Sequence, residues 1–129
     1  LAFDLEQMRE LGFNGVRTHI KVESRRFYWH ADRLGMLVVQ DAVNGGRNGT
    51  TFAEGALIQA TGRMRGDRSR RDLARTGRTA LAGRREFEAE LLAMIRLLEV
   101  HPSIVMWVPF NESWGQFESL RIEAAVGGP

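Results

Sequence analysis

Three short strand-like runs, each ending in polar or ionisable residues, constrain the fold of this chain more than any other feature. Residues 15–23 alternate apolar and polar side chains with a period of two, which is typical of a strand. Residues 36–39 and 104–110 are nearly unbroken apolar runs, as in strands that are buried on both faces of a parallel sheet. We expect three β-strands at these positions.

Helical sequence separates the three runs. Apolar residues recur at helical spacing in residues 3–11, in residues 25–34, and from about residue 85 to the residue before His101-Pro102. Gly12 and Gly35 follow the first two helices as stop signals, and another helix can begin within residues 117–125. Strands that alternate with helices predict an α/β fold with a parallel sheet and right-handed crossovers. A doubly wound sheet and a closed barrel both fit this pattern.

Length limits which of these folds the chain can complete. The 129 residues, 43% of them apolar, suffice for one compact domain, whereas a complete (β/α)₈ barrel needs about 250 residues. The chain opens at Leu1 and stops soon after the third run, so we expect a fragment of a longer protein. No apolar run is long enough to span a membrane and no signal-peptide pattern is present. The cell compartment stays open.

Residues 44–85 differ in kind from the rest of the chain. They are rich in Gly, Arg, Thr and Asn and lack sustained periodicity, except around residues 56–60, so we interpret them as a long loop or insertion. Within them, residues 62–85 hold nine Arg against two Asp, a local net charge of +7, which leaves −5 for the remainder. A nucleic-acid-binding module is therefore an alternative, although this segment has no aromatic residue for base stacking.

In a parallel α/β fold, functional groups gather where the strands end. The three strands end near Arg17, His19 and Lys21, in Gln40 and Asp41, and in Asn111 and Glu112. Alternation in the first strand would pack one set of side chains under helices, namely Val16, Thr18, Ile20 and Val22. It would direct a charged or polar set inward, namely Arg17, His19 and Lys21, and inward charges suggest a site for a polar ligand.

Glu112 is the best candidate for a catalytic carboxyl. It follows an apolar strand with Trp107, Phe110 and Trp114 close by, and apolar surroundings favour the protonated form that a general acid needs. Alternatively, Glu112 caps the next helix or pairs with an arginine. Asn111 either holds a hydroxyl group of a ligand or is a turn residue, and Trp114 either stacks on a ligand or packs against its loop.

Other kinds of site find little support. His19 is either a ligand or a structural histidine, and Asp41 is either a site residue or a helix cap. There is no nucleotide-binding glycine loop and no zinc-ligand spacing. Cysteine is absent, which excludes disulfides and thiolate metal sites within this sequence. We expect no cofactor and no metal.

Three separated blocks resemble glycoside hydrolase family 2, the family of β-galactosidases, β-glucuronidases and β-mannosidases, in the order that the family has them. Residues 101–116 read HPSIVMWVPFNESWGQ, residues 27–41 read FYWHADRLGMLVVQD, and residues 4–23 resemble the preceding helix and strand. Apart from the arginine-rich segment, the resemblance covers nearly the whole chain.

The resemblance implies a fold and a set of roles. The fold would be a partial (β/α)₈ TIM barrel, from about helix 1 through strand 4 and the start of helix 4, so that residues 1–129 are a fragment of one catalytic domain with an insertion at about 44–85. Glu112 would be the general acid/base, and Asn111 would hold the 2-hydroxyl of the sugar. Arg17 would lie beside the nucleophile, a Glu on strand seven. His19 and Asp41 would face the substrate, and Trp114 would bind it.

The function implied is hydrolysis of β-glycosides by a retaining double displacement. Partners would be the carbohydrate substrate, the remainder of the barrel and accessory β-sandwich domains, with no nucleic acid and no membrane. The sequence departs from the β-galactosidase pattern in THIK after Arg17 and in Pro-Phe before Asn111, so the sugar stays open. The fragment alone is expected to be inactive, because its nucleophile is missing. A sugar-binding barrel without a nucleophile is the other alternative, and the insertion is either part of the substrate entrance or a solvated loop.

Overall fold

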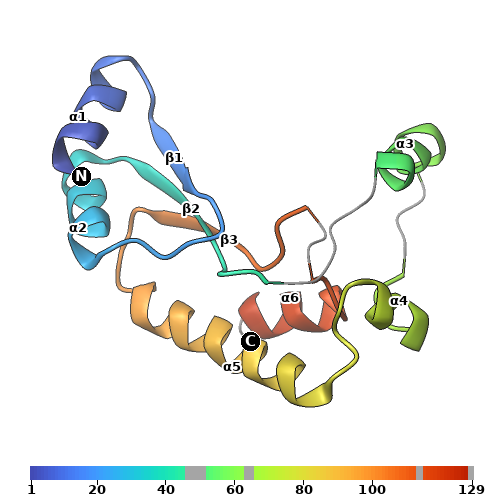
Figure 1. Ribbon diagram of the computed structural model, residues 1–129. Coiled ribbons are helices and arrows are strands. Elements are labelled where there is room, and N and C mark those ends of the chain that lie inside the picture. Colours follow the sequence, from blue (N-terminus) through green and yellow to red (C-terminus); the bar gives the residue numbers. More distant parts are fainter. Residues whose placement is uncertain (46–51, 63–65, 113–114, 128–129) are drawn as a thin grey trace.

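The computed structural model is an α/β arrangement of three parallel strands and six helices, and it describes residues 1–45, 52–62, 66–112 and 115–127 (Figure 1). The strands are β1 (Gly15–Thr18), β2 (Leu37–Asp41) and β3 (Ile104–Val108), and their order in the sheet is β1-β2-β3. Both pairings are parallel, as expected. The described strands form an open sheet rather than a closed barrel.

The described residues form six helices, which precede, connect or follow the strands. In chain order, the helices are α1 (Ala2–Glu10), α2 (Arg25–Leu34), α3 (Phe52–Thr61), α4 (Arg70–Arg75), α5 (Leu81–Leu98) and α6 (Ser119–Gly127). The predicted positions of α1, α2, α5 and α6 are confirmed within a few residues at each end. Gly35 ends α2 in the left-handed conformation, with a φ of 65°, as a C-terminal glycine commonly does. None of the described helices is both long and apolar enough to cross a lipid bilayer.

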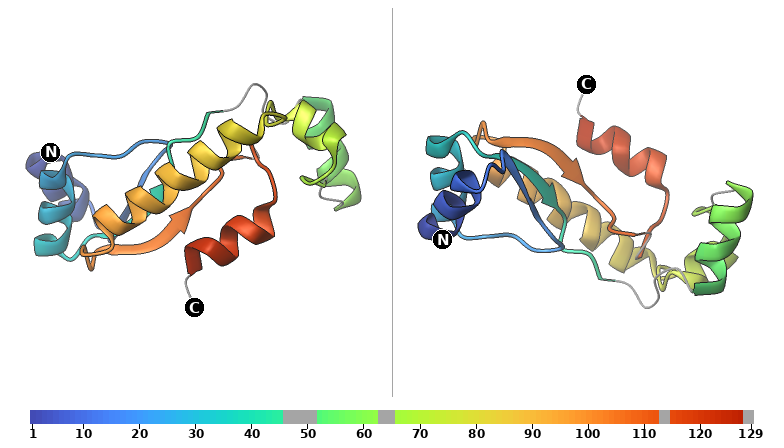
Figure 2. Two further views of the ribbon diagram at one scale, coloured as in Figure 1. Left: turned by 90° about the horizontal axis from the view of Figure 1, so that it is seen from below. Right: turned by 90° about the horizontal axis from the view of Figure 1, so that it is seen from above.

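The expected loop at residues 44–85 contains regular structure. It holds α3 and α4, and α5 begins four residues before its predicted start. Ser69 and Asp72 form a capping box at the start of α4: the Asp72 amide donates to Ser69 Oγ, and the Ser69 amide donates to Asp72 Oδ2. Both helices lie beyond one end of the sheet (Figure 2).

Two apolar clusters hold the elements together. The first packs α1, α2 and the C-terminal end of α5 against β2, with Leu5, Tyr28, Val38 and Leu98 almost fully buried. The second joins α5 and α6 to the segments that follow β2 and β3, and its buried members are Ala42, Phe87, Leu91, Phe117 and Ile122. The ends of β2 and β3 therefore lie directly beside a packed core.

The first strand is shorter than predicted. β1 ends at Thr18, and the chain then turns at Ile20, whose φ of 49° is a rare left-handed conformation for a β-branched residue. The expectation that Ile20 and Val22 pack under helices is wrong, since both are more than a third exposed. Buried polar side chains of β2 bind the backbone here, which ends the strand: Asp41 Oδ2 accepts from the Ile20 amide, and Gln40 Nε2 donates to the Lys21 carbonyl.

Candidate active site at the carboxyl ends of the strands

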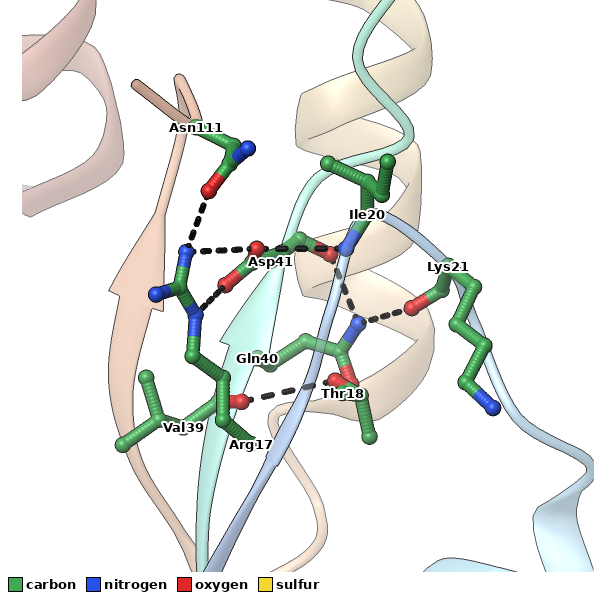
Figure 3. A network of polar contacts seen from close by, with 8 residues as sticks. All are labelled: Arg17, Thr18, Ile20, Lys21, Val39, Gln40, Asp41 and Asn111. Atoms are coloured by element: carbon green, nitrogen blue, oxygen red, sulfur yellow. Dashed lines mark hydrogen bonds and ion pairs between the residues drawn. The ribbon is translucent and has the colours of Figure 1, made fainter.

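Arg17 joins the ends of all three strands in one polar network (Figure 3). Its Nε and Nη2 atoms donate to the two carboxylate oxygens of Asp41, each at 2.8 Å, in the bidentate geometry that gives strong and directional pairing. Nη2 also donates to Asn111 Oδ1 at 2.8 Å. A residue of β1 thus fixes one residue at the end of β2 and another just after β3.

The guanidinium keeps its charge and one free nitrogen. Hydrogen bonding to Asp41 raises the pKa of Arg17, burial opposes this, and the negative charges of Asp41 and Glu112 raise it further. Among the described residues, none accepts a hydrogen bond from Nη1, and the side chain is 45% exposed. Arg17 can therefore bind one more anion at this edge of the sheet.

Asp41 lies beneath the site surface. Its side chain is fully buried, and its carboxylate accepts hydrogen bonds from Arg17 and from the Ile20 amide. A buried carboxylate with these contacts orients the Arg17 guanidinium. The expected contact between Asp41 and substrate is therefore not what this geometry supports.

A second buried chain of contacts supports the segment after β1. Tyr28 on α2 donates its hydroxyl hydrogen to Gln40 Oε1 at 2.6 Å and accepts a hydrogen bond from the Glu23 amide at 3.1 Å. Gln40 Nε2 in turn donates a hydrogen bond to the Lys21 carbonyl at 2.8 Å, which helps to fix the chain after β1. Tyr28 was not among the predicted site residues, and the one sequence signal for this network was a glutamine at the end of an apolar strand.

Glu112 lies next to Asn111 in the chain and close enough to Arg17 for its charge to act on the guanidinium. Its φ of 48° is unusual for a non-glycine residue, and such strained residues gather at functional sites. Its side chain is exposed, and within the described ranges no residue makes a hydrogen bond or ion pair with its carboxyl. The carboxyl is therefore accessible, and it neither caps α6 nor pairs with an arginine there.

Two of the three aromatic side chains predicted to lie near Glu112 pack within the apolar clusters. Trp107 packs against the first apolar cluster, and Phe110 stacks on Phe87 in the second, at 5.3 Å between ring centroids. These two rings pack against helices, and Glu112 is exposed. Trp114 lies outside the described residues.

Two further predicted positions stand apart from the network. His19 is exposed in the turn after β1, and no contact within the described part of the chain holds its ring. Lys21 points away from Arg17 (Figure 3) and pairs with Glu23. The inward row expected of Arg17, His19 and Lys21 is thus reduced to Arg17, because the strand ends at Thr18.

The arginine-rich segment is engaged partly in internal contacts. Arg75 pairs with Asp72, Arg84 Nη1 donates to the carbonyls of Arg78 and Thr79, and Arg78 binds the loops after β2 and β3. These contacts favour a structural use of those three arginines over phosphate binding. Over the ranges that the structure describes, no three His, Cys, Asp or Glu side chains gather as metal ligands.

Comparison with known proteins matches residues 1–125 to the family described as "Glycosyl hydrolases family 2, TIM barrel domain". The match covers the three strands and all but the last residues of α6. No curated protein matches the chain.

Proposed function

The chain belongs to glycosyl hydrolase family 2, and from this premise we propose that it contributes strands two to four to the (β/α)₈ catalytic barrel of a retaining β-glycosidase. Glu112 is the general acid/base in this proposal. The observation that carries it is the joining of Arg17, Asp41 and Asn111 at the strand ends, with the accessible carboxyl of Glu112 beside them.

The proposed reaction has two displacements. In the first, a carboxylate from another part of the barrel bonds to the anomeric carbon while Glu112 gives its proton to the departing glycosidic oxygen. In the second, Glu112 takes a proton from water, whose oxygen bonds to the anomeric carbon and releases the nucleophile. A retaining site holds its two carboxyl groups about 5 to 5.5 Å apart. The rest of the polypeptide supplies the nucleophile and the remaining strands, so the 129-residue chain alone is inactive.

The contacts of the network support further roles in this proposal. Arg17 has Nη1 free to face the nucleophile, where a cation keeps a carboxylate ionised. Asp41 orients Arg17, and its negative charge balances the positive charge of the guanidinium. Asn111 accepts from Arg17 through Oδ1, which leaves its amide nitrogen to donate to a sugar hydroxyl. His19 is exposed on the same edge and is available to the substrate.

The test is the dependence of kcat/KM on the leaving group in the full-length protein. The sugar is first chosen from aryl β-galactosides, β-glucuronides and β-mannosides. Glu112→Gln is expected to lower kcat/KM for a phenyl glycoside about 10² to 10⁴-fold, the usual contribution of general acid catalysis. The loss for a 2,4-dinitrophenyl glycoside is smaller, because dinitrophenolate departs without a proton.

The matched control is Glu123→Gln, which removes an exposed carboxylate on α6. It is expected to leave both substrates at the wild-type rate. Equal rates for Glu112→Gln and wild-type protein on the phenyl glycoside would rule out the proposed role of Glu112.

A further inference from the structure

Arg78 connects the arginine-rich segment to both strand-end loops. It lies between α4 and α5, and its Nε donates to the Gly115 carbonyl at 2.9 Å. Its Nη2 donates to the Gly45 carbonyl and, at 3.4 Å, to Asn44 Oδ1. One guanidinium therefore ties the segment after β2 to the segment after β3.

Arg78 is partly buried against two aromatic rings, Phe87 and Phe117. Its guanidinium carbon lies 4.8 Å from the ring centroid of Phe87 and 5.6 Å from that of Phe117. Burial lowers the pKa of Arg78. Within the described part of the chain no carboxylate pairs with it, so backbone carbonyls, the side-chain amide of Asn44 and ring faces provide its stabilising contacts.

Gly115 allows the two loops to touch. Its φ is 60°, and a Cβ at this position would lie 2.7 Å from the Gly45 carbonyl oxygen and 2.9 Å from Arg78 Nε. Only glycine fits such an approach without movement of the backbone. The junction of Arg78, Gly45 and Gly115 is therefore closely packed.

Asp67, near the start of the arginine-rich segment, contacts the beginning of α6 and the residues before it. Its carboxylate accepts from the Ser119 amide at 2.7 Å and from Gln116 Nε2 at 3.2 Å, and its carbonyl accepts from the Glu118 amide at 3.0 Å. Burial acts to raise the pKa of Asp67, and the hydrogen bonds from Ser119 and Gln116 outweigh it, so the pKa is lowered. An ionised carboxylate at the first turn of α6 is favourable to the helix.

Residues 115–119, downstream of Glu112, are thus held twice by residues outside the sheet, at Gly115 by Arg78 and at Gln116 and Ser119 by Asp67. Glu112 lies three residues before Gly115 and has a left-handed backbone conformation. We propose that Arg78 and Asp67 are positioning residues for proton transfer, which act by fixing the chain that carries Glu112. This inference rests on the proposed role of Glu112. It means that the arginine-rich segment supports catalysis by positioning the general acid/base.

A positioning role makes a selective prediction. Displacement of a general acid slows departure of a leaving group that needs a proton and spares one that does not. A merely structural role would lower the rates of both substrates together. The comparison of phenyl and 2,4-dinitrophenyl glycosides, made on the full-length protein, separates the two roles.

Three substitutions test this comparison. Arg78→Gln is expected to lower kcat/KM for the phenyl glycoside roughly ten- to a hundredfold, as a misplaced group does, with a change of under about threefold for the dinitrophenyl glycoside. Arg78→Lys is intermediate, since an ammonium cannot bridge both loops as the planar guanidinium does. Arg71→Gln is the matched control, because it removes an exposed arginine of α4 that makes no hydrogen bond or ion pair with other described residues. It is expected to match the wild type.

Asp67→Asn tests the same positioning role independently, and it serves as the test if Arg78→Gln fails to fold. It is expected to give a smaller but equally selective loss, because the amide oxygen can still accept from Ser119. Equal losses on both substrates, or wild-type rates on both, in Arg78→Gln and Asp67→Asn would overturn the inference.

Glu112→Gln, measured alongside, separates the two proposals. If it loses activity selectively on the phenyl glycoside while the Arg78 and Asp67 variants do not, the positioning role falls and the proposed function stands. If Glu112→Gln itself shows no dependence on the leaving group, both fall.

Discussion

Among single residues, Arg17 is the one whose contacts bring the candidate site together. Its contacts with Asp41 and Asn111 bring together positions 17, 41 and 111, which are far apart in the chain. The Asp41 carboxylate is fully buried, and such a group is costly unless a cation and hydrogen bonds satisfy it. Arg17 provides the cation, and Arg17 and the Ile20 amide provide the hydrogen bonds. We therefore expect Arg17 and Asp41 to behave as one unit.

A double-mutant cycle in the full-length protein tests that unit. Arg17→Lys and Asp41→Asn are each expected to lower kcat/KM about tenfold or more, because each misplaces the remaining partner. The double variant should lose less than the sum of the two, with a coupling of about 1 kcal/mol or more. Arg26→Gln, an exposed arginine of α2, should match the wild type. Strictly additive losses would show that Arg17 and Asp41 act separately.

Much of the candidate site was predictable from residues at strand ends. Arg17, Asp41, Asn111 and Glu112 lie at the edge where the apolar runs predicted a site. The contribution of Arg78 was not predictable, because nothing in a stretch with nine arginines distinguishes the one that packs between Phe87 and Phe117. The full burial of Asp41 also depends on tertiary contacts, since Ile20 turns toward it only after β1 ends.

At the scale of elements, Asp32 anchors α2 to the start of β3. Its Oδ2 lies 2.7 Å from His101 Nδ1, and its Oδ1 accepts from the Ser103 amide at 3.0 Å. Tyr28, one turn earlier on α2, packs its ring 5.3 Å from that of His101. These contacts lie at the opposite end of β3 from Glu112, so they concern stability rather than chemistry.

The pH dependence of stability tests this anchor. Burial acts to raise the pKa of Asp32, and hydrogen bonds from Ser103 and His101 outweigh it, so the folded pKa is depressed. A depressed carboxyl pKa gives stability that is present above the unfolded pKa and is lost as the pH falls through the folded pKa. Asp32→Asn should therefore cost about 1 to 3 kcal/mol at neutral pH and progressively less in acid.

The measurement is the difference in melting temperature between wild-type and Asp32→Asn full-length protein, followed from neutral to acid pH. Glu99→Gln, at the exposed end of α5, is the control and should show no such trend. A difference that stays constant with pH would contradict the assignment of the anchor to the ionised carboxylate.

For the whole molecule, the sheet formed by the described residues has two edges without a neighbouring strand. β1 and β3 are its outer strands, and Val105 and Met106 on β3 are each 56% exposed. The order of helices and strands was predicted from periodicity, because that order is a local property of the sequence. Closure of a sheet depends on strands that pair across long separations, so these three strands cannot establish it alone.

Azide rescue is the sharpest test of the proposed role of Glu112 in a retaining reaction with two carboxyl groups. Azide needs no general base, so it can attack the glycosyl-enzyme intermediate of Glu112→Gln where water cannot. Full-length Glu112→Gln with a 2,4-dinitrophenyl β-glycoside is expected to turn over faster as azide is added. Proton NMR should show a β-glycosyl azide as the product. An unchanged rate with azide, or an α-glycosyl azide as the product, would rule out the proposed role of Glu112.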